Sequence, residues 1–278
     1  MPGKLIFSLL LLLGYLLPTL SQAALPPDWQ PQFKIRAGIP PFSTIGRIMD
    51  ANHQALQGIN PDPAGWRLTE APHLVWLADA DFRIGPEMIW DRQQGGILMV
   101  SNLANQVEQA AAALDYAIYH RHTPVLLITG NSDSRAIALF NRGFSQTSEA
   151  ISRELNQLRT ALAPLPAYGM EVRDAASDGS GGGAGAGDDS NDSVRRLRQA
   201  EHNVDYQVAR ALERYRDRIK THRLVVVGGI IDLANYYGGG PGRLYLINLN
   251  GEIDPAKIKT SPHLVRVAPD LRGFIGRR

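Results

Sequence analysis

Cysteine is absent from this 278-residue chain, and its absence excludes several kinds of chemistry at once. Without a thiol, the protein forms no disulfide, has no thiolate nucleophile and offers no thiolate ligand to a metal. A strong charge of one sign is also missing, because 29 Lys and Arg face 27 Asp and Glu. This balance predicts no nucleic acid as a partner and no membrane contact in the mature protein. The hydrophobic share of 44% is nevertheless sufficient for a folded core.

A long hydrophobic run occurs only at the N-terminus. Lys4 precedes a mostly apolar run over residues 5–17, which is short for a bilayer core of about 30 Å. Pro18 ends the run, and Ser21-Gln22-Ala23 supplies small residues where a signal peptidase cuts. The pattern predicts a signal peptide over residues 1–23 and an exported protein, either periplasmic or secreted. An uncleaved membrane anchor is the alternative.

Short apolar runs alternate with helical patterns along the rest of the chain. The runs typical of buried strands lie at 74–77, 97–100, 125–128, 224–227 and 244–249. The stretches with helical periodicity lie at 45–56, 103–118, 136–162 and 197–219. Strands that are apolar on both faces and separated by helices predict an α/β fold, with a mostly parallel central sheet flanked by helices.

The predicted organisation is one domain behind an arm. Residues 24–42 are rich in proline and predict an extended N-terminal arm, followed by a single domain over residues 43–278. Residues 178–193, rich in Gly, Ser and Asp, predict a flexible insertion within that domain. The glycine-rich stretch 238–242 is followed by a strand pattern rather than a helix, which favours a hairpin turn over a phosphate-binding loop.

Six segments of the chain, in the right order, resemble the β-class carbonic anhydrases. Asp79-Ala80-Asp81-Phe82-Arg83 stands where the family usually has Cys-Ser-Asp-Ser-Arg, and the segment 130–134 stands where it has Gly-His-x-x-Cys. The other similar segments are 48–58, 97–105, 114–117 and 227–245. The resemblance implies a β-carbonic-anhydrase-like fold with an N-terminal helical arm, zinc as the family's cofactor, and a homodimer.

The positions of the family's zinc ligands depart from its pattern. When the family's ligand pattern is carried over residue by residue, its Cys, His and Cys positions fall on Asp79, Asn131 and Ser134. Zinc in such a site binds thiolate sulfur and imidazole nitrogen. The neutral oxygens of Asn and Ser suit harder ions and bind them weakly without more carboxylates. We therefore expect no metal cofactor in this chain.

Two other positions of the family pattern are retained. Asp81 and Arg83 stand at the family's Asp–Arg pair, in which the arginine holds the carboxylate and the aspartate orients the zinc-bound water. Without the metal, we expect this pair to fix the loop as an ion pair rather than to act in catalysis.

Loss of the zinc ligands predicts a non-catalytic homologue with a binding, scaffolding or regulatory role. Zinc generates the hydroxide for carbon dioxide hydration by lowering the pKa of bound water from about 16 to about 7. Two alternatives remain open. One is an active carbonic anhydrase-like lyase, or another metalloenzyme, that uses a site rebuilt around Asp79 and Asp81. The other is a sensor that binds bicarbonate or a similar small anion through Arg83.

Overall fold

The computed structural model describes residues 72–89, 96–162 and 186–277, and a few helical positions at 45, 47, 49, 50 and 53. The chain divides into two compact units, Met1–Pro61 and Asp62–Arg278. The helical positions of the first unit agree with the helix predicted there. The predicted signal peptide and extended arm lie outside the described residues. None of the helices that are described combines the length and apolar character needed to span a membrane.

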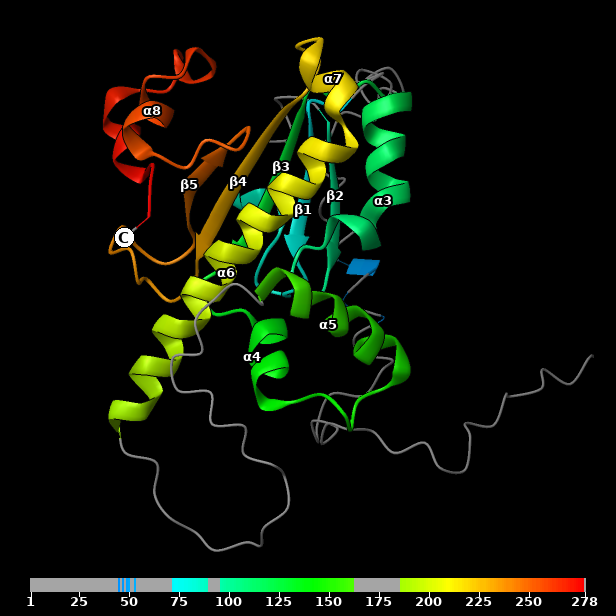
Figure 1. Cartoon of the computed structure of the whole chain (residues 1–278), viewed down its shortest axis with the longest axis vertical. Helices are drawn as coiled ribbons and strands as arrows, with labels where there is room; N and C mark the ends of the chain where they lie inside the picture. The colour runs from blue at the N-terminus through cyan, green and yellow to red at the C-terminus, as the bar shows by residue number, and fades with distance from the viewer. Residues whose placement is uncertain are drawn as a thin grey trace, which may run out of the picture. The chain divides into compact units, whose positions relative to one another are not determined.

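A five-stranded sheet forms the centre of the second unit (Figure 1), with strand order β2-β1-β3-β4-β5. The strands are β1 (Leu74–Asp79), β2 (Ile97–Asn102), β3 (Val125–Asn131), β4 (Val225–Asp232) and β5 (Arg243–Leu249). The first four are parallel, and β5 is antiparallel to β4. The predicted α/β fold with a mostly parallel sheet is therefore confirmed, as is the hairpin connection between the last two strands.

Helices follow or precede each parallel strand. They are η2 (Pro86–Met88), α3 (Val107–Asp115), η4 (Tyr116–His120), α4 (Arg135–Arg142), α5 (Glu149–Leu162), α6 (Ala186–Arg214), α7 (Arg216–Lys220), α8 (Pro255–Lys259), η5 (Pro262–Leu264) and η6 (Pro269–Phe274). Figure 1 shows α6 running along β3 and β4, and both strands contact it.

Alternate residues of the strands enter two apolar clusters. The larger cluster joins the sheet to α3, α5 and α6 through fully buried side chains, which include Leu77, Leu114, Ile128, Leu155 and Val204. On the other face, Trp76 packs with Leu127 and Ile231, and its indole N–H donates to Thr129 Oγ1 at 2.8 Å. Burial of both faces explains why the strands read as continuous apolar runs.

Two helices differ in extent from the sequence prediction. The helix expected from Leu103 begins at Val107, because Ala104 and Asn105 adopt left-handed conformations with φ of 58° and 47°. The pattern over 136–162 forms two helices, α4 and α5, because the chain turns at Gly143 with φ of 88°.

The start of α6 corrects the predicted insertion. The flexible segment was expected over 178–193, but residues from Ala186 onward are helical. Composition alone did not predict that residues 186–193 belong to this helix. Residues 163–185 lie outside the described part of the chain.

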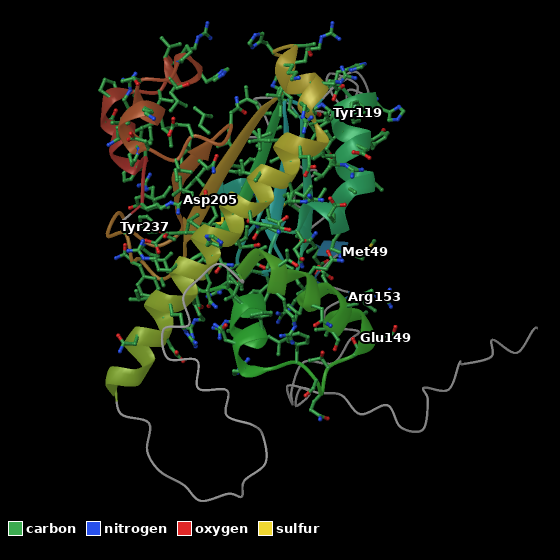
Figure 2. All side chains as sticks on the ribbon, in the orientation of Figure 1. Met49, Tyr119, Glu149, Arg153, Asp205 and Tyr237 are labelled. Atoms are coloured by element: carbon green, nitrogen blue, oxygen red, sulfur yellow. The ribbon has the colours of Figure 1, made fainter. Side chains whose placement is uncertain are left out.

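Two acidic side chains of α6, one turn apart, hold the C-terminal part of the unit. Glu201 accepts a hydrogen bond from Tyr237 Oη in the β4–β5 connection. Asp205 accepts from Asn248 of β5 at 2.8 Å and pairs with Arg277. Figure 2 shows Asp205 and Tyr237 on this side of the helix. The C-terminal segment is thereby attached to the same helix that covers the sheet.

Gly228 provides a test of how closely α6 packs on β4. A Cβ atom at this position would lie 2.8 Å from Val204 Cγ1 and 2.9 Å from Asn248 Cβ. We expect Gly228→Ala to lower the free energy of unfolding by about 1–3 kcal/mol in urea denaturation, because the crowded helix must move away. Gly273→Ala is the matched control, since no atom lies within 4 Å of its added Cβ. Equal losses in both variants would contradict this explanation.

Candidate functional site

The three residues at the predicted ligand positions meet at the carboxyl ends of β1 and β3. Asp79 is the last residue of β1, Asn131 is the last residue of β3, and Ser134 is the N-cap of α4. Their exposed fractions are 2%, 0% and 1%. In this strand order the connections from β1 and β3 leave in opposite directions, and α/β proteins place their ligand sites at such a point.

Asn131 and Ser134 both donate a hydrogen bond to the same oxygen of Asp79. Asp79 Oδ2 lies 2.5 Å from Ser134 Oγ and 3.0 Å from Asn131 Nδ2. Asp79 Oδ1 accepts from the main-chain N–H of Ala104 at 2.9 Å. We call these three side chains and the Ala104 N–H the Asp79 cluster. Donors from two different connections, β2–α3 and β3–α4, thus converge on one buried carboxyl group.

The second partners of Asn131 and Ser134 determine which atoms face Asp79. Asn131 Oδ1 accepts from the N–H of Asp133 at 2.9 Å, so the amide nitrogen is the end that faces Asp79. Ser134 Oγ accepts from the N–H of Ile137 at 3.2 Å, so its hydroxyl proton is directed at the carboxyl group. The hydrogens of both side chains, not their lone pairs, therefore point to the centre of the cluster.

Burial dominates the electrostatics of Asp79. Removal of the carboxyl group from water raises its pKa above the usual range, and the nearby Asp81 carboxylate acts in the same direction. The hydrogen bonds from Ser134 and Ala104 favour the charged form and oppose this shift. The cluster therefore stabilises a charge that its own burial disfavours.

Arg83 connects the loop after β1 to the loop after β3. Its Nε and Nη2 contact the two carboxylate oxygens of Asp81 at 2.8 and 2.6 Å, and its Nη1 contacts Asp133 Oδ2 at 2.9 Å. The Asp81 side chain is 2% exposed, against 30% for Arg83. Hydrogen bonding to Arg83 lowers the pKa of Asp81 and raises that of Arg83. The predicted Asp–Arg pair is thus present, and it holds two loops together.

Two contributors to this site were not identified from the sequence. Ala104 supplies its N–H only because its backbone is left-handed, which is uncommon for alanine and has no signal in the sequence. Asp133 completes the Arg83 ion pairs across 50 residues of chain. The sequence did place Asp133 between the predicted ligand positions Asn131 and Ser134, and this position could have identified it as part of the site.

The donor set of the Asp79 cluster does not match the set that zinc binds in proteins. Zinc takes deprotonated sulfur, imidazole nitrogen or carboxylate oxygen in a tetrahedral arrangement. Here the cluster contains one carboxyl group, and the oxygens of Asn131 and Ser134 already accept main-chain hydrogen bonds. Within residues 72–89, 96–162 and 186–277, no group of three His, Asp or Glu side chains is arranged to hold a metal ion.

A family profile described as carbonic anhydrase matches residues 74–239, which is more than half of the chain. This protein belongs to the β-class carbonic anhydrase family. The profile covers the strands β1 to β4 and both loops of the site, so the family resemblance found in the sequence is confirmed. No curated protein sequence matches this family member significantly.

Several solved β-carbonic anhydrases share the fold of this β-class family member. A tetrameric β-carbonic anhydrase from Sordaria macrospora is 20% identical, with a TM-score of 0.53, and the match covers 74% of this chain and 95% of that chain. The Coccomyxa β-carbonic anhydrase in complex with acetazolamide is 14% identical, with a TM-score of 0.52, and the match covers 80% of this chain and 91% of that chain. The β-carbonic anhydrase CafA of Aspergillus fumigatus is 15% identical, with a TM-score of 0.51, and the match covers 74% of this chain and 89% of that chain.

Removing the Ser134 hydroxyl tests the Asp79 cluster. We expect Ser134→Ala to lower the free energy of unfolding by about 2 kcal/mol at pH values above the pKa of Asp79, because a buried carboxylate loses a donor and α4 loses its cap. The hydrogen bond favours charged Asp79, so its contribution is present above the pKa of Asp79 and is lost as pH falls through it. The difference from wild type should therefore shrink in acid.

Denaturant titrations at several pH values provide the measurement. Ser145→Ala, at an exposed position in the turn before α5, is the control and should leave stability unchanged at each pH. A Ser134→Ala loss that is independent of pH would indicate that only the helix cap matters.

Proposed function

We propose that this protein is an exported, non-catalytic β-carbonic anhydrase homologue with a binding, scaffolding or regulatory role. The observation that carries this proposal is the orientation of Ser134 and Asn131, whose hydrogens are directed at Asp79 Oδ2. Side chains at the positions of the family's ligands thus satisfy one another instead of presenting lone pairs to an ion.

The chemistry of the family's reaction supports this proposal. Carbon dioxide hydration near neutral pH needs hydroxide, which bound zinc supplies in this family. To rebuild a metal site around Asp79 and Asp81, the chain would have to break the Ser134 and Asn131 hydrogen bonds on one carboxylate and the Arg83 ion pair on the other. Both carboxyl groups are nearly inaccessible, at about 2% exposure. The arrangement therefore favours a structural use of these residues.

The contacts of Arg83 also favour a structural role over a bicarbonate sensor. Its guanidinium reaches Asp81 through two nitrogens and Asp133 through a side-chain and a main-chain oxygen. Guanidinium has five N–H groups in a fixed plane, and these contacts use four of them. One N–H is left, so a small anion that binds the guanidinium through two N–H groups would have to displace one of these contacts.

A homodimer is part of the proposal. The family assignment and the tetrameric enzyme of Sordaria macrospora support an oligomer. Light scattering on the mature protein, cleaved after Ala23, measures the state directly. A dimer is expected, and a monomer at all concentrations would contradict this part of the proposal.

Zinc content tests the proposed loss of catalysis. After incubation with zinc and desalting, we expect the wild-type protein to retain far less than one zinc per chain and to leave carbon dioxide hydration at the rate of the buffer. The triple variant Asp79→Cys, Asn131→His, Ser134→Cys restores two thiolates and one imidazole, so it should retain about one zinc per chain. Elemental analysis gives both values.

A control variant tests whether zinc binding requires the ligands at the family's positions or only the presence of two cysteines and a histidine. Asp79→Cys, Asn131→His, Ser132→Cys introduces the same side chains with the second cysteine two positions earlier, and it should bind less zinc than the first triple variant. Tightly held zinc in the wild-type protein, together with hydration above the buffer rate, would contradict the proposal. If the first triple variant folds and stays free of zinc, then the residue-by-residue alignment with the family is wrong.

A further inference from the structure

Positive charge gathers at the amino ends of β3 and β4, which is the opposite end of the sheet from the Asp79 cluster. Two segments enter this region, residues 115–124 before β3 and residues 213–223 before β4. Together they hold six Lys and Arg but only three Asp and Glu. The local excess of three positive charges is larger than the net charge of +2 of the whole chain. This part of the molecule is therefore basic, although the charges of the whole chain nearly balance.

The sheet register places the two segments next to each other. Val125 pairs with Val225, and the N–H of Val225 donates to the carbonyl of Pro124 at 2.9 Å. Each segment turns through a histidine with a left-handed backbone, His122 with φ of 56° and His222 with φ of 55°. The two connections therefore reverse direction at equivalent positions of neighbouring strands.

Tyr119 fixes the two segments to each other. Its hydroxyl donates to Asp217 Oδ1 of α7 at 2.9 Å, and the Arg218 guanidinium lies 5.1 Å from the centre of its ring. Figure 2 shows Tyr119 at the end of the helix that follows α3, beside α7. The turns are also closed by main-chain hydrogen bonds, from Arg223 N to Arg218 O at 2.8 Å and from Arg121 N to Tyr116 O at 3.0 Å. The cations are thus carried on an ordered scaffold.

The acidic side chains of this region are already paired, and several cations are not. Asp115 pairs with Arg214 at 2.5 Å, and Glu213 pairs with Arg210 at 2.8 Å. Asp217 contacts Tyr119 and lies 3.9 Å from Arg218. In the described part of the chain, no acidic side chain forms an ion pair with the cations Arg121, Arg216, Lys220 or Arg223. These four define what we call the basic edge.

We propose that the basic edge binds the anionic headgroups of a phospholipid membrane. Unpaired Lys and Arg side chains held on one surface are attracted to anionic lipid, and each adds to the affinity. Tyr116, whose carbonyl accepts the Arg121 N–H at 3.0 Å, is 51% exposed and stacks on His120 with ring centres 6.3 Å apart. A half-exposed tyrosine next to cations suits the headgroup layer, where aromatic rings with a polar tip concentrate. The proposal does not depend on the Asp79 cluster.

Vesicle sedimentation of the mature chain tests the proposal. We expect binding to vesicles of phosphatidylcholine with phosphatidylglycerol, none to phosphatidylcholine alone, and weakening of the binding by salt. The variant Arg121→Gln, Lys220→Gln, Arg223→Gln removes three cations of the basic edge. Its partition onto anionic vesicles should fall by about 100-fold, as expected for three headgroup contacts.

A matched triple variant removes the same charge elsewhere. Arg142→Gln, Arg153→Gln, Arg266→Gln changes three exposed cations on α4, on α5 and near the C-terminus, and it should keep most of the wild-type binding. Figure 2 shows Arg153 on α5 with its ion-pair partner Glu149, away from Tyr119.

Three outcomes would overturn the proposal. The first is equal binding of the wild-type protein to both kinds of vesicle. The second is an equal loss in the two triple variants, which would indicate an effect of net charge alone. The third is binding to a single-stranded DNA oligonucleotide without binding to anionic vesicles, which would identify nucleic acid as the polyanion instead.

Discussion

The hydrogen bonds that Asn131 and Ser134 donate to Asp79 Oδ2 are the contacts on which the site depends. They join the end of β1, the end of β3 and the start of α4 around one buried carboxyl group. The N–H of Ala104 adds the loop after β2. A metal held by side chains at these positions would join the same elements. Hydrogen bonds around a carboxyl group can supply that structural connection without supplying a nucleophile.

The two ends of the sheet have contrasting charge. At the carboxyl ends, Asp81 and Asp133 form ion pairs with Arg83 and Arg135, and Asp79 is enclosed by donors. At the amino ends, Arg121, Arg216, Lys220 and Arg223 form no ion pair with any acidic side chain among the described residues. The exposed end with unsatisfied charge is the better candidate for contact with other molecules. The enclosed end is suited to holding the fold together.

The strands could be predicted from the sequence because apolar runs follow general rules, whereas the set Asp79, Asn131 and Ser134 was implied by the resemblance to the family. The left-handed backbone of Ala104 could not be predicted, since it results from tertiary contacts that override alanine's own preference. Asp133 reaches Arg83 only once the sheet places their loops side by side. The basic edge was hidden for a similar reason, because its two segments are about a hundred residues apart in the sequence.

Anomalous diffraction from a crystal soaked in zinc, recorded at the zinc absorption edge, distinguishes hydrogen bonding from metal coordination at the Asp79 cluster. We expect no anomalous peak between Asp79, Asn131 and Ser134, and we expect the Asn131 amide and the Ser134 hydroxyl still to donate to Asp79 Oδ2. A peak at about 2 Å from the oxygens of these three side chains would contradict this account, because that distance is the signature of coordination rather than hydrogen bonding.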